Sequence, residues 1–331
     1  MEETKTKTKS SPEPIIDLSA LKTNGLLFHY IDVLPRHATF ASRAMDKNVR
    51  KHEIVTNGGR KKRTVYDPSR LLKFIQGRIR EQLLLRIPQP EYVTGFVPGR
   101  GSVFNARQHT GARMVVNIDL KDFFPTITPK RVFGLLKSRF ALADSPASTL
   151  TKLMTFEDHL CQGFVTSPDI ANIVCAHLDR RLSRLAAVLD LRYTRYADDL
   201  TFSGPDWHGS VDKFLDTVRT IVSDEGFVVH PEKIAIMRRG RRQRVTGIVV
   251  SQDGTVGIDS RMRRTLRAAC HHWPQQTDER KRQIMGWRSY VMSVNPKHAE
   301  ELDRMIARSE GVSNWTRGVP HGSFSKDLGK E

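Results

Sequence analysis

Two adjacent carboxylates, Asp198 and Asp199, lie in the middle of the stretch RYTRYADDLTFSG, which covers residues 192–204. Apolar and β-prone residues flank them on both sides, a pattern typical of a β-hairpin with the aspartates at its tip. Two carboxylates presented together at a tip repel each other. A divalent cation would offset this repulsion, and Mg²⁺ prefers carboxylate oxygens while keeping positions open for phosphates. Adjacent aspartates also occur in solvated turns, so the pair alone does not establish a metal site.

A third acid, Asp119, ends the apolar run RMVVNID at residues 113–119, which is predicted to form a strand. If this strand lies beside the hairpin, Asp119 and Asp198 face each other across the ladder. The carboxylates could then hold two cations about 4 Å apart, as in polymerase-type phosphoryl transfer. In that chemistry one ion activates an attacking hydroxyl and the other stabilises a leaving pyrophosphate.

The net charge favours a polyanionic partner. Lys and Arg together number 54 and Asp and Glu 36, which gives +18. Such an excess favours nucleic acid or an acidic membrane surface. Between Lys233 and Arg267 there are ten Lys or Arg residues and two acids, and this clustering indicates contacts with phosphates.

Other features of the composition indicate a cytoplasmic protein that does not associate with a membrane. No apolar run approaches the roughly 18 residues of a membrane span, and the polar start MEETKTKTKSSPEP has no apolar core of a secretory signal. The three cysteines, Cys161, Cys175 and Cys270, form no CxxC pair, which argues against a disulfide framework and a zinc site.

The 331 residues allow roughly two domains. We expect hairpins at 48–66, with its turn at 57–59, and at 192–204, and strands at 114–118, 227–230, 234–237 and 245–250, the last turned back at 253–254. We expect helices at 69–86, 129–140, 167–187, 211–225, 260–272, 278–293 and 297–308. Residues 1–14 and the C-terminal tail are predicted to be disordered. Strands and helices thus interleave up to about residue 257 and helices follow, which predicts the α+β class.

Four segments in this order resemble the motifs of reverse transcriptases. NIDLKDFFPTI (117–127) resembles their first aspartate motif, QGFVTSP (162–168) their QGxxxSP motif, YADD (196–199) their YxDD box and HPEK (230–233) their lysine motif. Two further segments resemble motifs of the bacterial retron type. These are NARQH (105–109), which is similar to NAxxH, and the triplet Val245-Thr246-Gly247. The resemblance covers roughly residues 48–255.

The resemblance implies a right-hand polymerase fold with fingers, an antiparallel palm and a helical thumb. In this sequence the expected boundaries are an N-terminal extension at 1–47, fingers at 48–112, a palm at 113–257, a thumb at 258–310 and a flexible tail at 311–331. Part of the fingers would be inserted in the palm at about 128–165.

The family's catalytic roles are carried over onto five residues. Asp119 and Asp198 would be the main ligands of two Mg²⁺ ions, for which Mn²⁺ could substitute. Asp199 would assist through its charge, and Leu120 would lend its backbone carbonyl. Lys233 would neutralise or protonate the leaving pyrophosphate.

The resemblance also implies a deoxynucleotide site. Phe124 would exclude a ribose 2′-hydroxyl, although one of Phe123 and Phe124 is expected to pack in the core. Gln162, with Gly163 beside it, would contact the pair of template and substrate bases. Lys61, Lys62 and Arg63 would clamp the triphosphate, because the arginine fork matches phosphate oxygens. Val55-Thr56-Asn57 stands where relatives often carry a lysine, so the residue that meets the γ-phosphate is left open.

Other residues are expected to contact nucleic acid. His109, with Asn105 in the same motif, is expected to form a structural hydrogen bond or to contact RNA. The remaining set consists of basic residues and the retron triplet: Arg238, Arg239, Arg241, Arg242, Arg244, Val245, Thr246 and Gly247.

The implied function is that of a retron reverse transcriptase. Such an enzyme copies a dedicated structured RNA (msr–msd) from deoxynucleoside triphosphates, starts from a 2′-hydroxyl of that RNA and makes a branched RNA–DNA product (msDNA). A role in anti-phage defence with a separate effector protein is expected. Because no RNase H-like carboxylates follow the thumb, template removal is expected from a host RNase H. The alternatives are a reverse transcriptase of the group II intron or diversity-generating type, and a non-catalytic RNA-binding scaffold.

Overall fold

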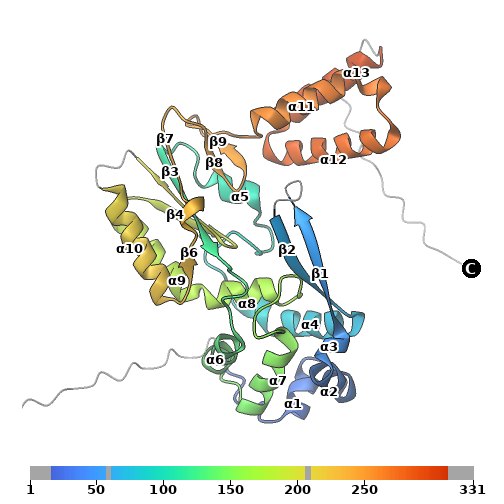
Figure 1. The fold of residues 1–331 in the computed structure, drawn as a ribbon, viewed down its shortest axis with the longest axis vertical. Coiled ribbons are helices and arrows are strands. Elements are labelled where there is room, and N and C mark those ends of the chain that lie inside the picture. The colour runs from blue at the N-terminus through green and yellow to red at the C-terminus, as the bar shows by residue number, and fades with distance from the viewer. Residues whose placement is uncertain (1–15, 57–60, 206–209, 312–331) are drawn as a thin grey trace, which may run out of the picture.

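The computed structural model describes residues 16–56, 61–205 and 210–311 (Figure 1). Antiparallel sheets and helices interleave as far as Gly257, and helices follow, so the α+β class is confirmed. The stretch predicted to be disordered at 1–14, residues 312–331 of the tail predicted at 311–331, and the predicted turn at 57–59 lie outside the described residues. No helix in the described ranges is long and apolar enough to cross a bilayer.

The central sheet is built around strand β3 (Met114–Lys121), in the order β4-β5-β3-β6. Strands β4 (Arg192–Tyr196) and β5 (Asp199–Gly204) lie on one side of β3, and β6 (Val228–Val229) and β7 (Ala235–Arg238) pair with its other edge. Helices α9 (Ala176–Val188) and α10 (Val211–Asp224) lie alongside the sheet (Figure 1). The inward residues of the central strands are therefore apolar and almost fully buried, Ile118, Leu200 and Phe202 among them.

The register of this sheet corrects one expectation. The Cα partner of Asp119 across the ladder is Asp199, and Asp198 lies in the turn between β4 and β5. The backbone carbonyl of Asp198 accepts a hydrogen bond from the Leu120 amide at 3.0 Å. Asp198 is thus tied to the residue after Asp119 through the backbone, and it reaches Asp119 from the turn rather than from the ladder.

A second group of elements forms the base of the molecule and carries a long hairpin. The base contains α1 (Asn24–Tyr30), α2 (Pro35–Arg43), α3 (Met45–Asn48), α4 (Arg70–Gln82), η1 (Leu84–Arg86), α6 (Pro129–Phe140), α7 (Asp144–Met154) and α8 (Ser167–Val174). The hairpin consists of β1 (Val49–Thr56) and β2 (Lys61–Pro68), and it stands across from the central sheet (Figure 1). Both groups share one continuous hydrophobic core.

Three C-terminal helices, α11 (Ser260–His271), α12 (Asp278–Val294) and α13 (Pro296–Ser309), lie at one end of the molecule (Figure 1). They share a second core with a small sheet of β8 (Gln243–Val245), β9 (Ile248–Val250) and β10 (Val256–Gly257), and with α5 (Ser102–Arg107). The short helices η2 (Pro231–Lys233) and η3 (Trp273–Gln275) complete the described elements.

Two predicted elements are wrong in detail. The strand expected at 245–250 is a hairpin of β8 and β9, because Thr246 (φ 48°) and Gly247 (φ 81°) both adopt left-handed backbone conformations and turn the chain back. The single helix expected at 167–187 is divided into α8 and α9 at Cys175.

Candidate active site

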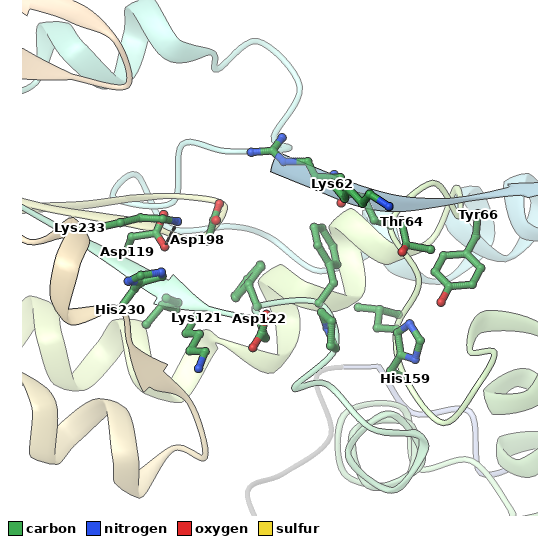
Figure 2. Close-up of a pocket in the computed structure, with 17 residues that line it drawn as sticks. Lys62, Thr64, Tyr66, Asp119, Lys121, Asp122, His159, Asp198, His230 and Lys233 are labelled. Atoms are coloured by element: carbon green, nitrogen blue, oxygen red, sulfur yellow. Dashed lines mark hydrogen bonds and ion pairs between the residues drawn. The ribbon is translucent and has the colours of Figure 1, made fainter. Parts of the chain in front are cut away.

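Side chains from five separate segments converge on one cavity of about 550 Å³ (Figure 2). One wall is formed by β3 and the residues after it, from Asp119 to Pro125, together with Asp198 of the turn. The opposite side is formed by residues 62–66 of β2 and by residues 159–162. His230 and Lys233 close the cavity beside Asp119. The cavity therefore has acidic groups on the sheet and basic groups on the hairpin and on η2.

The two carboxylates at the turn between β4 and β5, Asp198 and Asp199, have pKa values raised by burial and by neighbouring carboxylates. Burial raises the pKa of Asp198, and the Asp119 carboxylate raises it further, against the opposing charges of Lys233 and Arg63. Burial also raises the pKa of Asp199, to about 6, with the charges of Asp198 and Asp119 acting in the same direction. A divalent cation would stabilise the charged form of such carboxylates, because they lie close together, are partly desolvated and have few positive charges nearby.

The three aspartates do not converge on a single point. Asp119 and Asp198 line the main cavity, whereas Asp199 lines a neighbouring cavity of about 410 Å³ with Tyr196, Thr246 and other residues. Within the described ranges, no group of three or more His, Cys, Asp or Glu side chains is placed to hold one metal ion. Asp199 therefore borders a different cavity from Asp119 and Asp198, and its expected role through charge stays a prediction.

Two carboxylates nevertheless fit a magnesium site, because Mg²⁺ is commonly held by one or two protein carboxylates and completed by substrate phosphates and water. In the structure the Lys233 ammonium forms an ion pair with the Asp119 carboxylate, which is 13% exposed (Figure 2). A cation bound at Asp119 would replace this ammonium as the counter-charge.

Phe124 lies at the edge of the cavity, while Phe123 packs inside the protein. Phe123 is 4% exposed and stacks on Phe227 with ring centroids 5.8 Å apart. Phe124 is half-buried, contacts the rings of Phe96 and Phe123, and lines the cavity. One of the two rings is thus a core residue and the other faces the site, as the sequence suggested.

The loop of Gln162 and Gly163 lies directly against β2. The Tyr66 amide donates a hydrogen bond to the Gln162 carbonyl at 2.8 Å, and Gln162 lines the cavity. A Cβ added to Gly163 (φ 114°) would lie 2.2 Å from the Tyr66 carbonyl oxygen. The absence of a side chain at Gly163 therefore allows a close backbone approach to the hairpin β1–β2.

The basic residues of β2 differ in their surroundings. Arg63 is exposed, lines the cavity and is close enough for its charge to oppose the raised pKa of Asp198. Lys62 also lines the cavity, and its ammonium lies 3.4 Å from the Glu53 carboxylate in an exposed ion pair. Lys61 begins β2 at the edge of the described residues.

Asn105 and His109 lie inside the protein, which argues against the predicted RNA contact. Both are fully buried. The two ring nitrogens of His109 are 2.7 Å from the hydroxyls of Ser203 and Thr194, and the side-chain amide of Asn105 lies 2.9 and 2.6 Å from the hydroxyls of Thr94 and Thr194. Burial lowers the pKa of His109 to about 3, so the ring is neutral. The motif attaches the segment 105–109 to β4 and β5.

The predicted RNA-contact residues near β8 form three groups. Arg238 is exposed at the end of β7, and Arg239 and Arg241 are exposed on the connection from β7 to β8. Arg242 and Arg244 form ion pairs with Asp259, the residue that caps α11. In the triplet, Val245 is buried, whereas Thr246 and Gly247 line the second cavity next to Asp199.

Two polar clusters beside the site were not predicted. Tyr66 donates a hydrogen bond to Glu157 at 2.7 Å, and Lys51 lies 2.9 Å from the same carboxylate. The second cluster surrounds Arg195 at the base of the turn between β4 and β5. Tyr66 and Glu157 are 91 residues apart, so no local pattern in the sequence could have indicated their contact.

Comparison with known proteins agrees with the motifs. Residues 50–285 match the family described as reverse transcriptase (RNA-dependent DNA polymerase). The retron Ec86 reverse transcriptase of Escherichia coli is 35% identical over 266 residues, which cover 80% of this chain and 82% of that protein. The retron Mx65 and Mx162 reverse transcriptases of Myxococcus xanthus are 39% and 37% identical, and the matches span 60% and 59% of their lengths. The chain therefore belongs to the reverse transcriptases and, within them, to the retron type.

Proposed function

We propose that this chain adds deoxynucleotides to a growing DNA strand on an RNA template in the cavity between β3 and β2. The reaction is attack of a 3′-hydroxyl on the α-phosphate of a deoxynucleoside triphosphate, with pyrophosphate as the leaving group. One observation carries the proposal: two partly buried carboxylates, Asp119 and Asp198, face Arg63 across a cavity, with Lys233 paired to Asp119, in a chain of the reverse transcriptase family.

We assign the parts of the polymerase hand accordingly. The central sheet with α9 and α10 would form the palm, and the hairpin β1–β2 with helices of the base would form the fingers, including the inserted segment at about 128–165. Helices α11–α13 would form the thumb. The continuous core of palm and base supports a fixed frame around the cavity, and the separate core of α11–α13 supports a distinct third part.

Two Mg²⁺ ions would be held by Asp119 and Asp198, with the Leu120 carbonyl as a further ligand and Asp199 contributing through its charge. When bound, the ions would activate the attacking hydroxyl and stabilise the charge on the leaving pyrophosphate. Asp199 lies across the ladder from Asp119 and faces the second cavity, a placement that supports an indirect electrostatic role.

Lys233 changes partners in this proposal. In the structure its ammonium neutralises Asp119. With cations bound at that carboxylate, the ammonium would be able to turn to the triphosphate, where it would offset negative charge or give a proton to the pyrophosphate oxygen. Arg63 on the opposite side would hold the outer phosphates, since its guanidinium can donate two parallel hydrogen bonds.

Phe124 and Gln162 would select the substrate. The Phe124 ring faces the cavity and is supported by Phe96 and Phe123, so it would crowd a ribose 2′-hydroxyl. Gln162 is exposed at the cavity wall with its backbone fixed to Tyr66, which leaves its side chain free to contact the base pair.

The retron-type activity is the finer part of the proposal. We propose that the template is a dedicated structured RNA, that synthesis starts from a 2′-hydroxyl of this RNA and that the product is branched. The chain would act in anti-phage defence with a separate effector, and a host RNase H would remove the template. The relatives' description as retron reverse transcriptases supports this reading, and the exposed Arg238, Arg239 and Arg241 offer phosphate contacts for such an RNA.

A primer-extension assay tests the polymerase activity. The wild type should extend a primer on an RNA template with Mg²⁺ and deoxynucleotides, and Asp198→Asn should be inactive although folded. Absence of synthesis by the wild type contradicts the proposal. Sequencing the nucleic acid that copurifies from the native host tests the retron part, which predicts one RNA joined to DNA through a 2′-linkage.

A further inference from the structure

The turn that carries Asp198 has a backbone conformation that needs support. Ala197, directly before Asp198, adopts a left-handed conformation with φ 56°. Residues other than glycine pay a free-energy cost there, and such conformations persist only where the surrounding structure imposes them. Ala197 has no polar side chain that could stabilise the turn from within. The orientation of Asp198 must therefore be fixed by contacts from outside the turn.

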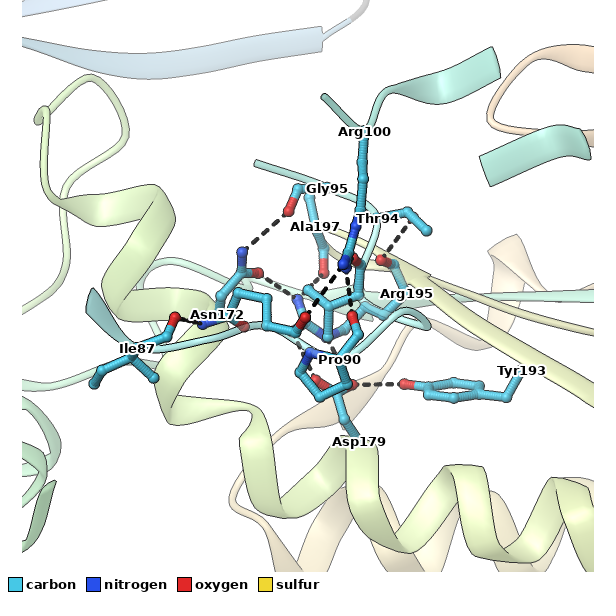
Figure 3. Close-up of polar contacts among 12 residues, drawn as sticks. Ile87, Pro90, Thr94, Gly95, Arg100, Asn172, Asp179, Tyr193, Arg195 and Ala197 are labelled. Carbon is cyan, nitrogen blue, oxygen red and sulfur yellow. Dashed lines mark hydrogen bonds and ion pairs between the residues drawn. The ribbon is translucent and has the colours of Figure 1, made fainter. Parts of the chain in front are cut away.

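Arg195 supplies one of these contacts from below the turn (Figure 3). Its side chain is fully buried, and its guanidinium donates hydrogen bonds to both carboxylate oxygens of Asp179, at 2.8 and 2.7 Å. A further nitrogen donates to Asn172 at 3.1 Å and to the backbone carbonyl of Ala197 at 3.2 Å. The arginine thus links helices α8 and α9 to the strained residue.

The segment at residues 92–95 holds the same turn from the outer edge of β4. The Thr94 amide and hydroxyl both donate to the Arg195 carbonyl, at 2.9 and 3.0 Å, and the Arg195 amide donates to the Tyr92 carbonyl at 2.8 Å. Gly95 lies so close that an added Cβ would be 2.5 Å from the Ala197 nitrogen. Asn172 joins the two supports, because its amide donates to the Gly95 carbonyl at 3.0 Å.

A buried ion pair fills this space at a higher desolvation cost than apolar side chains would. Taking a guanidinium and a carboxylate out of water costs free energy that apolar side chains of similar volume would not incur. An apolar side chain at position 195 could fill the volume, but it could not donate a hydrogen bond to the Ala197 carbonyl. The ion pair therefore fixes the geometry of the turn, which an apolar pair of the same volume would not do.

We infer that Arg195 is a positioning residue for nucleotide addition: held by Asp179 and Asn172, its guanidinium fixes the Ala197 carbonyl and thereby the direction of the Asp198 carboxylate. This inference rests on the proposed function. It predicts that loosening the support weakens cation binding and slows the chemical step while substrate binding on the hairpin side stays intact.

The test uses the full-length double variant Arg195→Met/Asp179→Asn. Methionine fills the space of the arginine stem, and asparagine keeps an acceptor for the Tyr193 hydroxyl, which lies 2.7 Å from Asp179. No unpaired buried charge remains, so the variant should fold. We expect kcat and Mn²⁺ affinity, the latter measured by calorimetry without substrate, each to fall roughly tenfold or more. KM for the deoxynucleotide should change little.

The matched control is Arg181→Met, on the same helix as Asp179. Arg181 pairs with Asp224 and Glu225 on α10, away from the turn, at 2.7 and 2.9 Å. It should keep the kcat and Mn²⁺ affinity of the wild type even if its thermal stability is lower. A purely structural role of Arg195 predicts a lower melting temperature with unchanged Mn²⁺ affinity, and that result would overturn the inference.

Asn172→Ala decides the question if the double variant does not fold, since it leaves the ion pair in place and removes the hydrogen bonds of Asn172 with Arg195 and with the Gly95 carbonyl. It should lower kcat and Mn²⁺ affinity together, and wild-type values for both would contradict the inference. An active wild type with unaffected variants rejects the role of Arg195 alone, whereas an inactive wild type rejects the proposed function.

Discussion

At the scale of single residues, burial decides which groups can do chemistry. His109 is the clearest case, because a histidine in a recognisable motif invites a functional role. It is fully buried between two hydroxyls, and burial lowers its pKa to about 3. A histidine that stays neutral through the physiological range serves as a hydrogen-bonded strut between β4 and β5.

His109 predicts a specific loss of stability in mild acid. The unfolded chain binds a proton at the ordinary histidine pKa near 6.5, whereas the folded chain does not until about pH 3. The contribution of the neutral His109 ring to the free energy of unfolding is therefore fully present well above pH 6.5. It decreases as the pH falls through that value. Between pH 7.5 and 5.0 the loss from this residue should be about 2 kcal/mol.

Urea unfolding at the two pH values measures this loss. His109→Gln should show a drop about 2 kcal/mol smaller than that of the wild type. His29→Gln, at an exposed position on α1, should lose as much as the wild type. Equal drops for wild type and His109→Gln would show that the ring is protonated in the folded protein.

Phe124 predicts the sugar preference of the enzyme. Its ring lines the cavity and is supported by Phe96 and Phe123. Phe124→Ala should open space for a ribose 2′-hydroxyl, so the ratio of kcat/KM for deoxynucleotides over ribonucleotides should fall roughly tenfold to a hundredfold. Single-nucleotide incorporation with both substrates measures the ratio, and an unchanged ratio would remove Phe124 from the role.

At the scale of elements, the contact between the loop at 162–163 and β2 fixes the two walls of the cavity. Gly163 has φ 114° and lies against the Tyr66 carbonyl, so an alanine there suffers both backbone strain and a clash. Gly99 offers a matched control, since it has φ 76° but no atom within 4 Å of an added Cβ.

Gly99→Ala should cost about 1 kcal/mol of unfolding free energy from backbone strain alone. Gly163→Ala should cost at least about 2 kcal/mol more and should lower nucleotide addition, because the hairpin must move away from the loop. Chemical denaturation of both variants measures the difference. Equal losses of unfolding free energy in the two variants would mean that the hairpin moves away from the loop without a measurable cost. The contact would then not set the width of the cavity.

An element could be predicted where the residues that determine it are adjacent in the sequence. The helix at 129–140 was predicted at its observed bounds because Pro129 opens it, and the structure adds Thr128 as its N-cap. The hairpin of β8 and β9 was missed because its turn places Thr246, a β-branched residue, in a left-handed conformation. The site followed the same rule: motif order brought Asp119 and Asp198 together correctly, but the support of Arg195 by Asp179 depends on tertiary packing that the sequence does not show.

At the scale of the whole molecule, ion pairing divides the basic residues near β8 into two classes. Arg242 and Arg244 are engaged by Asp259, where they fasten β8 to the start of α11. Arg238, Arg239 and Arg241 are exposed at the end of β7 and on the connection that follows it. Only arginines that can reach phosphates release counterions on binding, so the two classes should contribute differently to RNA affinity.

The triple variant Arg238→Ala/Arg239→Ala/Arg241→Ala should therefore reduce the slope of log Kd for RNA against log salt by about 2 to 3. Arg242→Ala/Arg244→Ala should reduce it less and should lower the thermal stability, because Asp259 loses both counter-charges. Arg180→Ala/Arg184→Ala, at exposed positions on α9, is the control for net charge. Fluorescence titrations at several salt concentrations measure the slopes. If removing the α9 pair flattens the dependence as much per charge as removing the β7–β8 arginines, RNA binding follows net charge, and the connection before β8 is not a contact surface.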